Sequence, residues 1–105
     1  MYLSHLSSVP HNPHYLNRYI RLIEHWSNQT IPEETYTEIH HICPRSMFPE
    51  LDKEKSNLIT LTGRQHFIAH WLLWKIYRNK SMSMAFFNMK CRNVSCTSFS
   101  LPYSN

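Results

Sequence analysis

The segment TGRQHFIAHWLLWKIY, residues 62–77, predicts the main helix of the chain and decides the fold around it. Thr62 and Gln65 form a T-x-x-Q capping box, in which each side chain bonds a backbone N–H at the helix start. Apolar residues then recur at helical spacing to about Tyr77. His66 and His70 are four residues apart, so their side chains project from one face of this helix.

Two short segments of β-favouring residues precede this helix. Residues 36–41, YTEIHH, predict a strand that ends in His40 and His41, whose side chains should point to opposite sides. Residues 58–61, LITL, predict a second strand, and the prolines and polar residues of 42–56 predict a loop between the two. A unit of two strands and one helix buries little surface by itself, so a bound metal would be a natural stabilising element.

The flanking sequence predicts one helix on each side of this centre. Asn12 before Pro13 is a helix start signal, and helical apolar spacing continues to residue 26, whereas residues 1–11 look irregular. On the other side, Ser81 could cap a short last helix with an apolar stripe at Met82, Ala85, Phe86 and Met89. We expect a loosely ordered tail from Asn93 onward.

The expected organisation is therefore a central unit between two smaller segments. Residues 1–35 would form an N-terminal helical segment, 36–80 the central core, and 81–105 a short helix with a Ser-rich tail. The chain has 105 residues, enough for a single domain with a modest core.

Composition bounds the function further. One glycine in the chain excludes a Gly-rich phosphate-binding loop. No apolar run approaches the roughly 18 residues of a membrane span and the N-terminus lacks a secretion signal, so we expect an intracellular protein without a membrane partner.

All seven acids lie between Glu24 and Glu54, whereas the chain from Lys55 onward has seven basic residues and no acid. This asymmetry indicates a polyanionic partner, nucleic acid first, although a solvated basic face would give the same pattern.

The cysteines bear on the redox compartment, and the histidines bear on metal binding and base catalysis. Three cysteines without a CxxC pair fit a reducing compartment with free thiols, and a disulfide or zinc site at Cys91 and Cys96 is the alternative. The eight histidines are more informative, because neutral imidazole is the commonest metal ligand and a natural base near pH 7. The zinc-protease helix motif shares the spacing of His66 and His70, but its glutamate is replaced by Phe67, which excludes that class.

Residues 36–44, YTEIHHICP, and 57–70, NLITLTGRQHFIAH, together resemble the HNH endonucleases of the histidine–metal finger superfamily. The resemblance covers about 36–78 and is closest to small phage-encoded and homing-type members. It implies an α+β fold: a small ββα-metal finger, made of a short hairpin with a long loop plus a helix, flanked by an N-terminal helix and a short C-terminal helix.

The resemblance also implies roles for individual residues. Three histidines would hold one divalent metal ion: His40, His66 and His70. Some members of the family use fewer ligands, so either of the two helix histidines could be a spectator. His41 would be the general base, and Asn57 would brace the loop and help to orient that base. Glu38 matches an acid near the active site of the colicin-type branch, and a solvated strand carboxylate is the alternative reading.

These residue types suit phosphodiester hydrolysis. A neutral His41 can take a proton from water near pH 7. An ion on three neutral imidazoles keeps its full charge and open positions, so it can offset negative charge on the phosphate. Nitrogen ligands suit zinc or nickel, and magnesium or manganese stays open when phosphate oxygens complete the shell.

The predicted function is a metal-dependent endonuclease that hydrolyses DNA phosphodiester bonds, by nicking or by double-strand cleavage, in the host cytoplasm if the chain is phage-encoded. Arg64, Lys75 and Arg78 could contact DNA phosphates, with ordinary solvent exposure as the alternative for each, and RNA stays open as a substrate.

The alternative functions are a non-catalytic, metal-stabilised nucleic-acid-binding module and a degenerate relic of a nuclease. Homing-type enzymes commonly carry a separate recognition region, and the sequence after residue 90 is short and Ser-rich. We therefore expect weak specificity, a homodimer, or a partner that supplies recognition.

Overall fold

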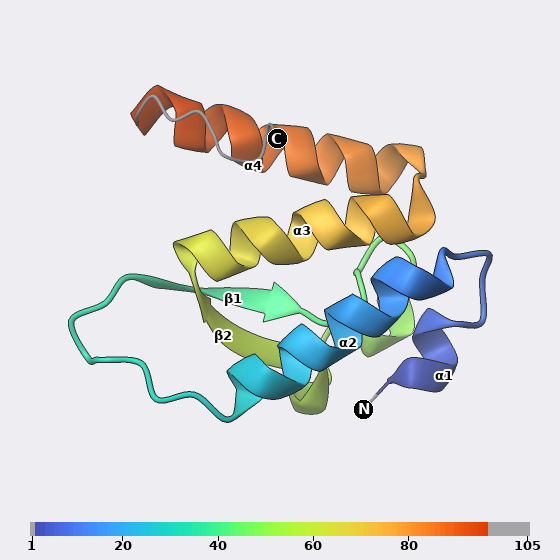
Figure 1. Ribbon diagram of the computed structural model, residues 1–105, viewed down its shortest axis with the longest axis horizontal. Helices are drawn as coiled ribbons and strands as arrows, with labels where there is room; N and C mark the ends of the chain where they lie inside the picture. The colour runs from blue at the N-terminus through green and yellow to red at the C-terminus, as the bar shows by residue number, and fades with distance from the viewer. Residues whose placement is uncertain (1, 97–105) are drawn as a thin grey trace.

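The computed structural model describes residues 2–96, with side chains for 2–89. Within that range the chain folds into helices and a two-stranded sheet, an α+β fold as the sequence predicts (Figure 1). The elements are α1 (Leu3–Leu6), α2 (Pro13–Ser27), β1 (Thr37–His41), β2 (Leu58–Thr62), α3 (Gly63–Tyr77) and α4 (Lys80–Cys96). The connection between the strands contains two 3-10 turns, Pro49–Leu51 and Lys55–Asn57.

The hairpin and α3 form the predicted ββα unit. β1 and β2 pair antiparallel, with His40 opposite Ile59 and His41 opposite Leu58. α3 follows β2 directly, and its capping box is confirmed: the Thr62 side chain accepts from the Gln65 N–H, while the Gln65 side chain accepts from the Thr62 N–H. This arrangement is compatible with a ββα-metal finger, and it sets His40 of β1 beside the helix.

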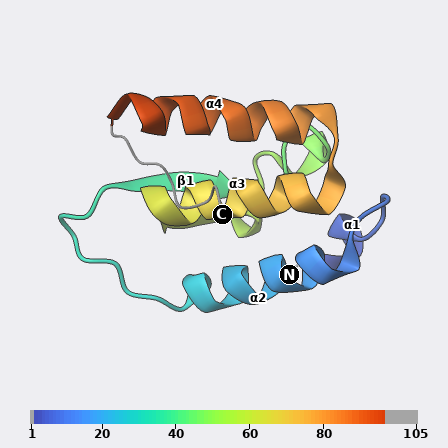
Figure 2. The same cartoon turned by 45° about the horizontal axis from the view of Figure 1, so that its top comes forward.

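Helix α3 lies between α2 on one side and α4 on the other (Figure 2). The buried face of α2 includes Leu16, Tyr19 and Ile23, which belong to the same apolar core as Leu72 and Leu73 of α3. Asn12 caps α2 as predicted, because its side chain accepts from the backbone N–H groups of residues 14 and 15. Since α2 and the hairpin share one core, the N-terminal helix is built into the unit that carries the histidines.

A second, smaller cluster fixes α4 to the other face of α3. It joins the buried Phe67 of α3 to Phe86 and Met89 of α4, with Trp71 and Trp74 packed against it. Met82, Phe86 and Met89 of the predicted stripe are buried, and Ala85 is half-buried. Within the described residues, no helix is both long and apolar enough to cross a bilayer.

The structure differs from the sequence predictions at the chain ends. Residues 3–6, expected to be irregular, form the one-turn helix α1, whose Leu6 is buried in the core. The last helix is longer than predicted and runs through Asn93 to Cys96, and Asn79 rather than Ser81 bonds its first turn, by accepting from the Met82 N–H. The rest of the predicted tail, residues 97–105, and the side chains of Cys91 and Cys96 lie outside the described part.

Candidate metal centre

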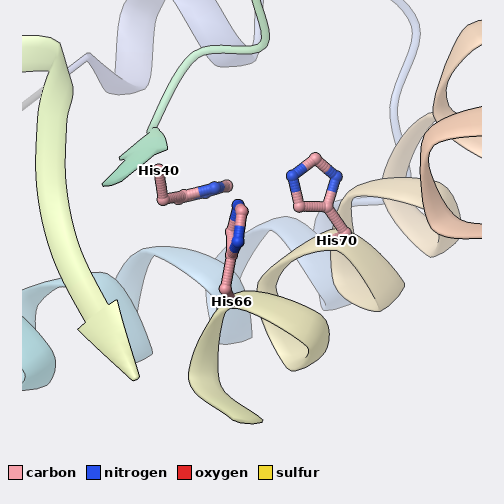
Figure 3. A group of neighbouring side chains, drawn as sticks. All are labelled: His40, His66 and His70. Carbon is pink, nitrogen blue, oxygen red and sulfur yellow. The ribbon is translucent and has the colours of Figure 1, made fainter. Parts of the chain in front are cut away.

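Three histidines converge from two elements of the ββα unit. His40 projects from β1, and His66 and His70 project from successive turns of α3, with the rings pointing toward one another (Figure 3). Their ring centroids are 4.9–5.2 Å apart, and one nitrogen from each ring lies within 4.8 Å of the others. This is the set that the resemblance to HNH endonucleases implies as the metal ligands, and its members could hold an ion.

His40 is the deepest member of the cluster, with 1% of its surface exposed. Burial lowers the pKa of its imidazole, and the neighbouring His70, His66 and His41 lower it further. The neutral ring that this favours is the form that binds a metal ion. Its Nε2 lies 2.8 Å from the hydroxyl of Tyr19 on α2, while its Nδ1 is buried without a hydrogen-bond partner in the described structure.

His66 is held by Glu38 of β1. The carboxylate Oε1 lies 2.5 Å from Nδ1 of His66, and its Oε2 accepts a hydrogen bond of 2.5 Å from the Tyr36 hydroxyl. Because a carboxylate only accepts, Nδ1 of His66 carries the proton and Nε2 carries the lone pair. Glu38 therefore does not behave as a solvated strand carboxylate. It orients a histidine of the cluster, as carboxylates beside metal-bound histidines commonly do.

The donor set fits a transition-metal ion. A tetrahedral ion with metal–nitrogen bonds of about 2.0–2.1 Å holds its ligand atoms about 3.3 Å apart. The nitrogens here lie within 4.8 Å, so small side-chain adjustments bring them to that spacing. An ion would also bond the buried, partnerless Nδ1 of His40, and buried polar atoms in native proteins nearly always have a partner.

His41 is not part of this cluster, as strand alternation predicts. Its side chain is 31% exposed, and its Nε2 lies 2.9 Å from Oδ1 of Asp52 in the loop between the strands. Since the carboxylate only accepts, Nε2 of His41 donates the proton, and Nδ1 keeps the lone pair that could accept one. Sequence reasoning did not identify Asp52, because a single acid in a polar loop carries no spacing signal.

Asn57 is completely buried and ties the loop together. Its side-chain oxygen accepts from the Cys43 N–H at 2.7 Å, and its amide donates to the carbonyls of Cys43 and Leu51 at 3.2 Å each. Its own carbonyl accepts from the Ile42 N–H at 2.8 Å. These bonds close the loop immediately after His41, which is the bracing arrangement that the resemblance implies for this residue.

The three predicted DNA-binding residues are spread along α3. Arg64 is exposed in the first turn, whereas Lys75 and Arg78 lie at the far end. The Lys75 ammonium lies 5.3–5.9 Å from the ring centres of Tyr15, Trp71 and Trp74. The Arg78 guanidinium lies 4.8 Å from the ring centre of Trp74. These are cation–π distances, so both cations contact the protein's own aromatic surface. Their contact with DNA stays a prediction.

Sequence reasoning missed the contact from α2 to the cluster. The sequence pattern predicted Tyr19 only as a member of the apolar face of a helix. A buried tyrosine usually finds a partner for its hydroxyl, which was the available signal. Nothing in the sequence indicated that the partner would be His40, 21 positions away.

Curated relatives bear on this site. The chain is 55% identical over 58 residues to "Probable mobile endonuclease E" of Enterobacteria phage T4, a match that covers 55% of this chain and 40% of that protein. It is 46% identical over 74 residues to "Probable mobile endonuclease B" of the same phage, covering 68% of this chain and 27% of that protein. The chain thus spans less than half the length of these relatives.

Two other comparisons give no match. No protein-family model matches the chain, and no solved structure is significantly similar to it. The similarity to proteins named mobile endonucleases therefore stands beside the three-histidine cluster as the main indication of what the chain does.

Proposed function

We propose that the chain is the catalytic unit of a metal-dependent endonuclease of the HNH type that hydrolyses DNA phosphodiester bonds. The observation that carries this proposal is the convergence of His40, His66 and His70, with His41 next to the first of them and outside the cluster. The names of the phage T4 relatives support an endonuclease activity, and the histidine pattern supports the HNH type.

In this proposal the three clustered histidines hold one divalent ion, with zinc, nickel, manganese or magnesium as candidates. When bound, the ion supplies positive charge beside the scissile phosphate and so stabilises the transition state. His66 presents its lone pair on Nε2, because its Nδ1–H donates to the Glu38 carboxylate.

His41 acts as the general base. Asp52 accepts a hydrogen bond from the Nε2–H of His41 and fixes the ring, so that Nδ1 takes a proton from the attacking water. Asn57 holds the start of the loop that carries Asp52, and in this way it keeps His41 and its partner in register. A positioned base of this kind contributes about 10²–10⁴-fold to the rate.

The basic half of the chain supports a polyanionic substrate. No acid follows Glu54, and Arg64 stands exposed two positions before His66 on α3. Phosphate contacts position a nucleic acid without reading its sequence. Target choice would then depend on a homodimer, on a partner, or on sequence that the matched relatives have beyond this unit.

A cleavage assay on supercoiled plasmid tests the proposal. The wild-type chain is incubated with Mg²⁺, Mn²⁺, Ni²⁺ or Zn²⁺ and with a chelator control, and nicked and linear products are separated on a gel. We expect cleavage with at least one ion and none with chelator. His41→Ala should lose about 10²–10⁴-fold in rate while it still binds metal.

Two further variants make the assay specific. His70→Ala should lose metal binding and cleavage together. The matched control is His25→Ala, an exposed histidine on α2, which should cleave like the wild type. Full activity in His41→Ala would remove that residue as the base. DNA binding without nicking in any metal would favour the non-catalytic binding module instead.

A further inference from the structure

The hydroxyl of Tyr19 lies at the back of His40. Tyr19 belongs to α2, outside the hairpin and helix, and its side chain is completely buried. The hydroxyl lies 2.8 Å from Nε2 of His40 and 2.7 Å from the carbonyl oxygen of Ile42, and these are its two polar contacts in the described structure.

One proton on the phenol decides the direction of both bonds. The Ile42 carbonyl can only accept, so the Tyr19 hydroxyl donates to it. The phenol oxygen must then accept from His40, which requires the proton of that imidazole to be on Nε2. In a neutral imidazole the other nitrogen, Nδ1, carries the lone pair.

Nδ1 of His40 is the nitrogen that has no protein partner. It is buried, and no group in the described structure bonds to it. The ring packs at 5.1 Å from His66 and 5.2 Å from His70, centre to centre, and one nitrogen of each ring lies within 4.8 Å of the others (Figure 3). Since Nε2 of His40 already bonds Tyr19, Nδ1 is the nitrogen left to bind an ion held by the three rings.

We propose that Tyr19 is a positioning residue for the metal centre: it holds His40 as the Nε2–H tautomer and so makes Nδ1 the ligand atom. This inference rests on the proposed metal site and extends it to α2. The N-terminal helix then does more than cover the core, because it supplies the partner that selects the ligating nitrogen of the deepest histidine.

Partners of this kind usually contribute 10–100-fold to metal affinity. The test is the Tyr19→Phe variant, which removes one oxygen and keeps the ring in the core. The matched control is Tyr15→Phe on the same helix, because the Tyr15 hydroxyl makes no hydrogen bond in the described structure. Co²⁺ titrations followed by visible absorption give the metal affinity of each protein without any DNA.

We expect Tyr19→Phe to bind Co²⁺ about 10–100-fold more weakly than wild type, and Tyr15→Phe to bind within about twofold. Thermal melts of the metal-free proteins identify a temperature at which each protein is fully folded. The titrations are run at that temperature, so a change in Co²⁺ affinity does not reflect unfolding. A folded Tyr19→Phe with wild-type affinity would overturn the inference while leaving the metal site intact. A wild-type chain that binds no Co²⁺ would instead remove the site itself.

A second measurement does not depend on the variant folding. Long-range ¹H–¹⁵N NMR correlations report which nitrogen of each imidazole carries the proton, and His40→Gln assigns the signal of His40. In the metal-free wild type we expect the Nε2–H pattern for His40. An Nδ1–H pattern would overturn the inference whatever the titrations give.

Discussion

Replacement of Asn57 by alanine probes the loop that carries the proposed catalytic pair. The variant loses three buried bonds: the one from the Cys43 N–H and the two to the carbonyls of Cys43 and Leu51. An unsatisfied buried group costs about 1–3 kcal/mol. Water can reach some of the vacated space, so we expect a loss of about 3 kcal/mol of unfolding free energy.

That loss is large against the roughly 5–15 kcal/mol of a typical domain. It corresponds to a fall in melting temperature of roughly 12–24 °C for a chain of this size. Urea unfolding followed by tryptophan fluorescence measures the free energy. Asn17→Ala, an exposed asparagine on α2, is the matched control and should stay within about 0.5 kcal/mol of wild type. An Asn57→Ala variant within about 1 kcal/mol of wild type would refute the bracing role.

Three other predictions follow from the site and the core. Saturating Zn²⁺ or Co²⁺ at about 100 times its dissociation constant should stabilise the wild type by about 2.7 kcal/mol, and calorimetry should find no such gain in His70→Ala. Asp52→Asn should lower kcat with little change in KM, because it leaves substrate contacts alone and loosens His41, and an unchanged kcat would exclude the pair. Burial raises the pKa of Cys43 to about 12, so it stays a thiol at pH 8. Mass spectrometry should therefore find Cys43 unmodified by iodoacetamide in the native protein and modified in urea.

The parts of the fold that the sequence predicts correctly are those set by local rules. A capping box and helical spacing define α3, and an asparagine followed by a proline defines the start of α2. The i, i+4 spacing of His66 and His70 places both rings on one face of α3 before any tertiary contact is known. Strand alternation likewise separates His40 from His41, and the structure buries the first and leaves the second partly exposed.

The remaining features depend on contacts between distant segments. Tyr19 meets His40, and Asp52 meets His41, only because α2 and the loop fold back onto β1. The helical turn α1 forms where Leu6 enters the core, and no local pattern marks it. Lys75 lies over aromatic rings of both α2 and α3, a neighbourhood that the predicted DNA contact did not anticipate.

A crystal structure of the chain grown with Zn²⁺ or Mn²⁺ would show whether the three histidines bind a metal ion, because anomalous scattering locates the ion without reference to activity. We expect one strong anomalous peak between the three rings, from an ion bonded to Nδ1 of His40, to Nε2 of His66 and to one nitrogen of His70. An ion bound elsewhere, or rings that turn away from one another in the presence of metal, would contradict it.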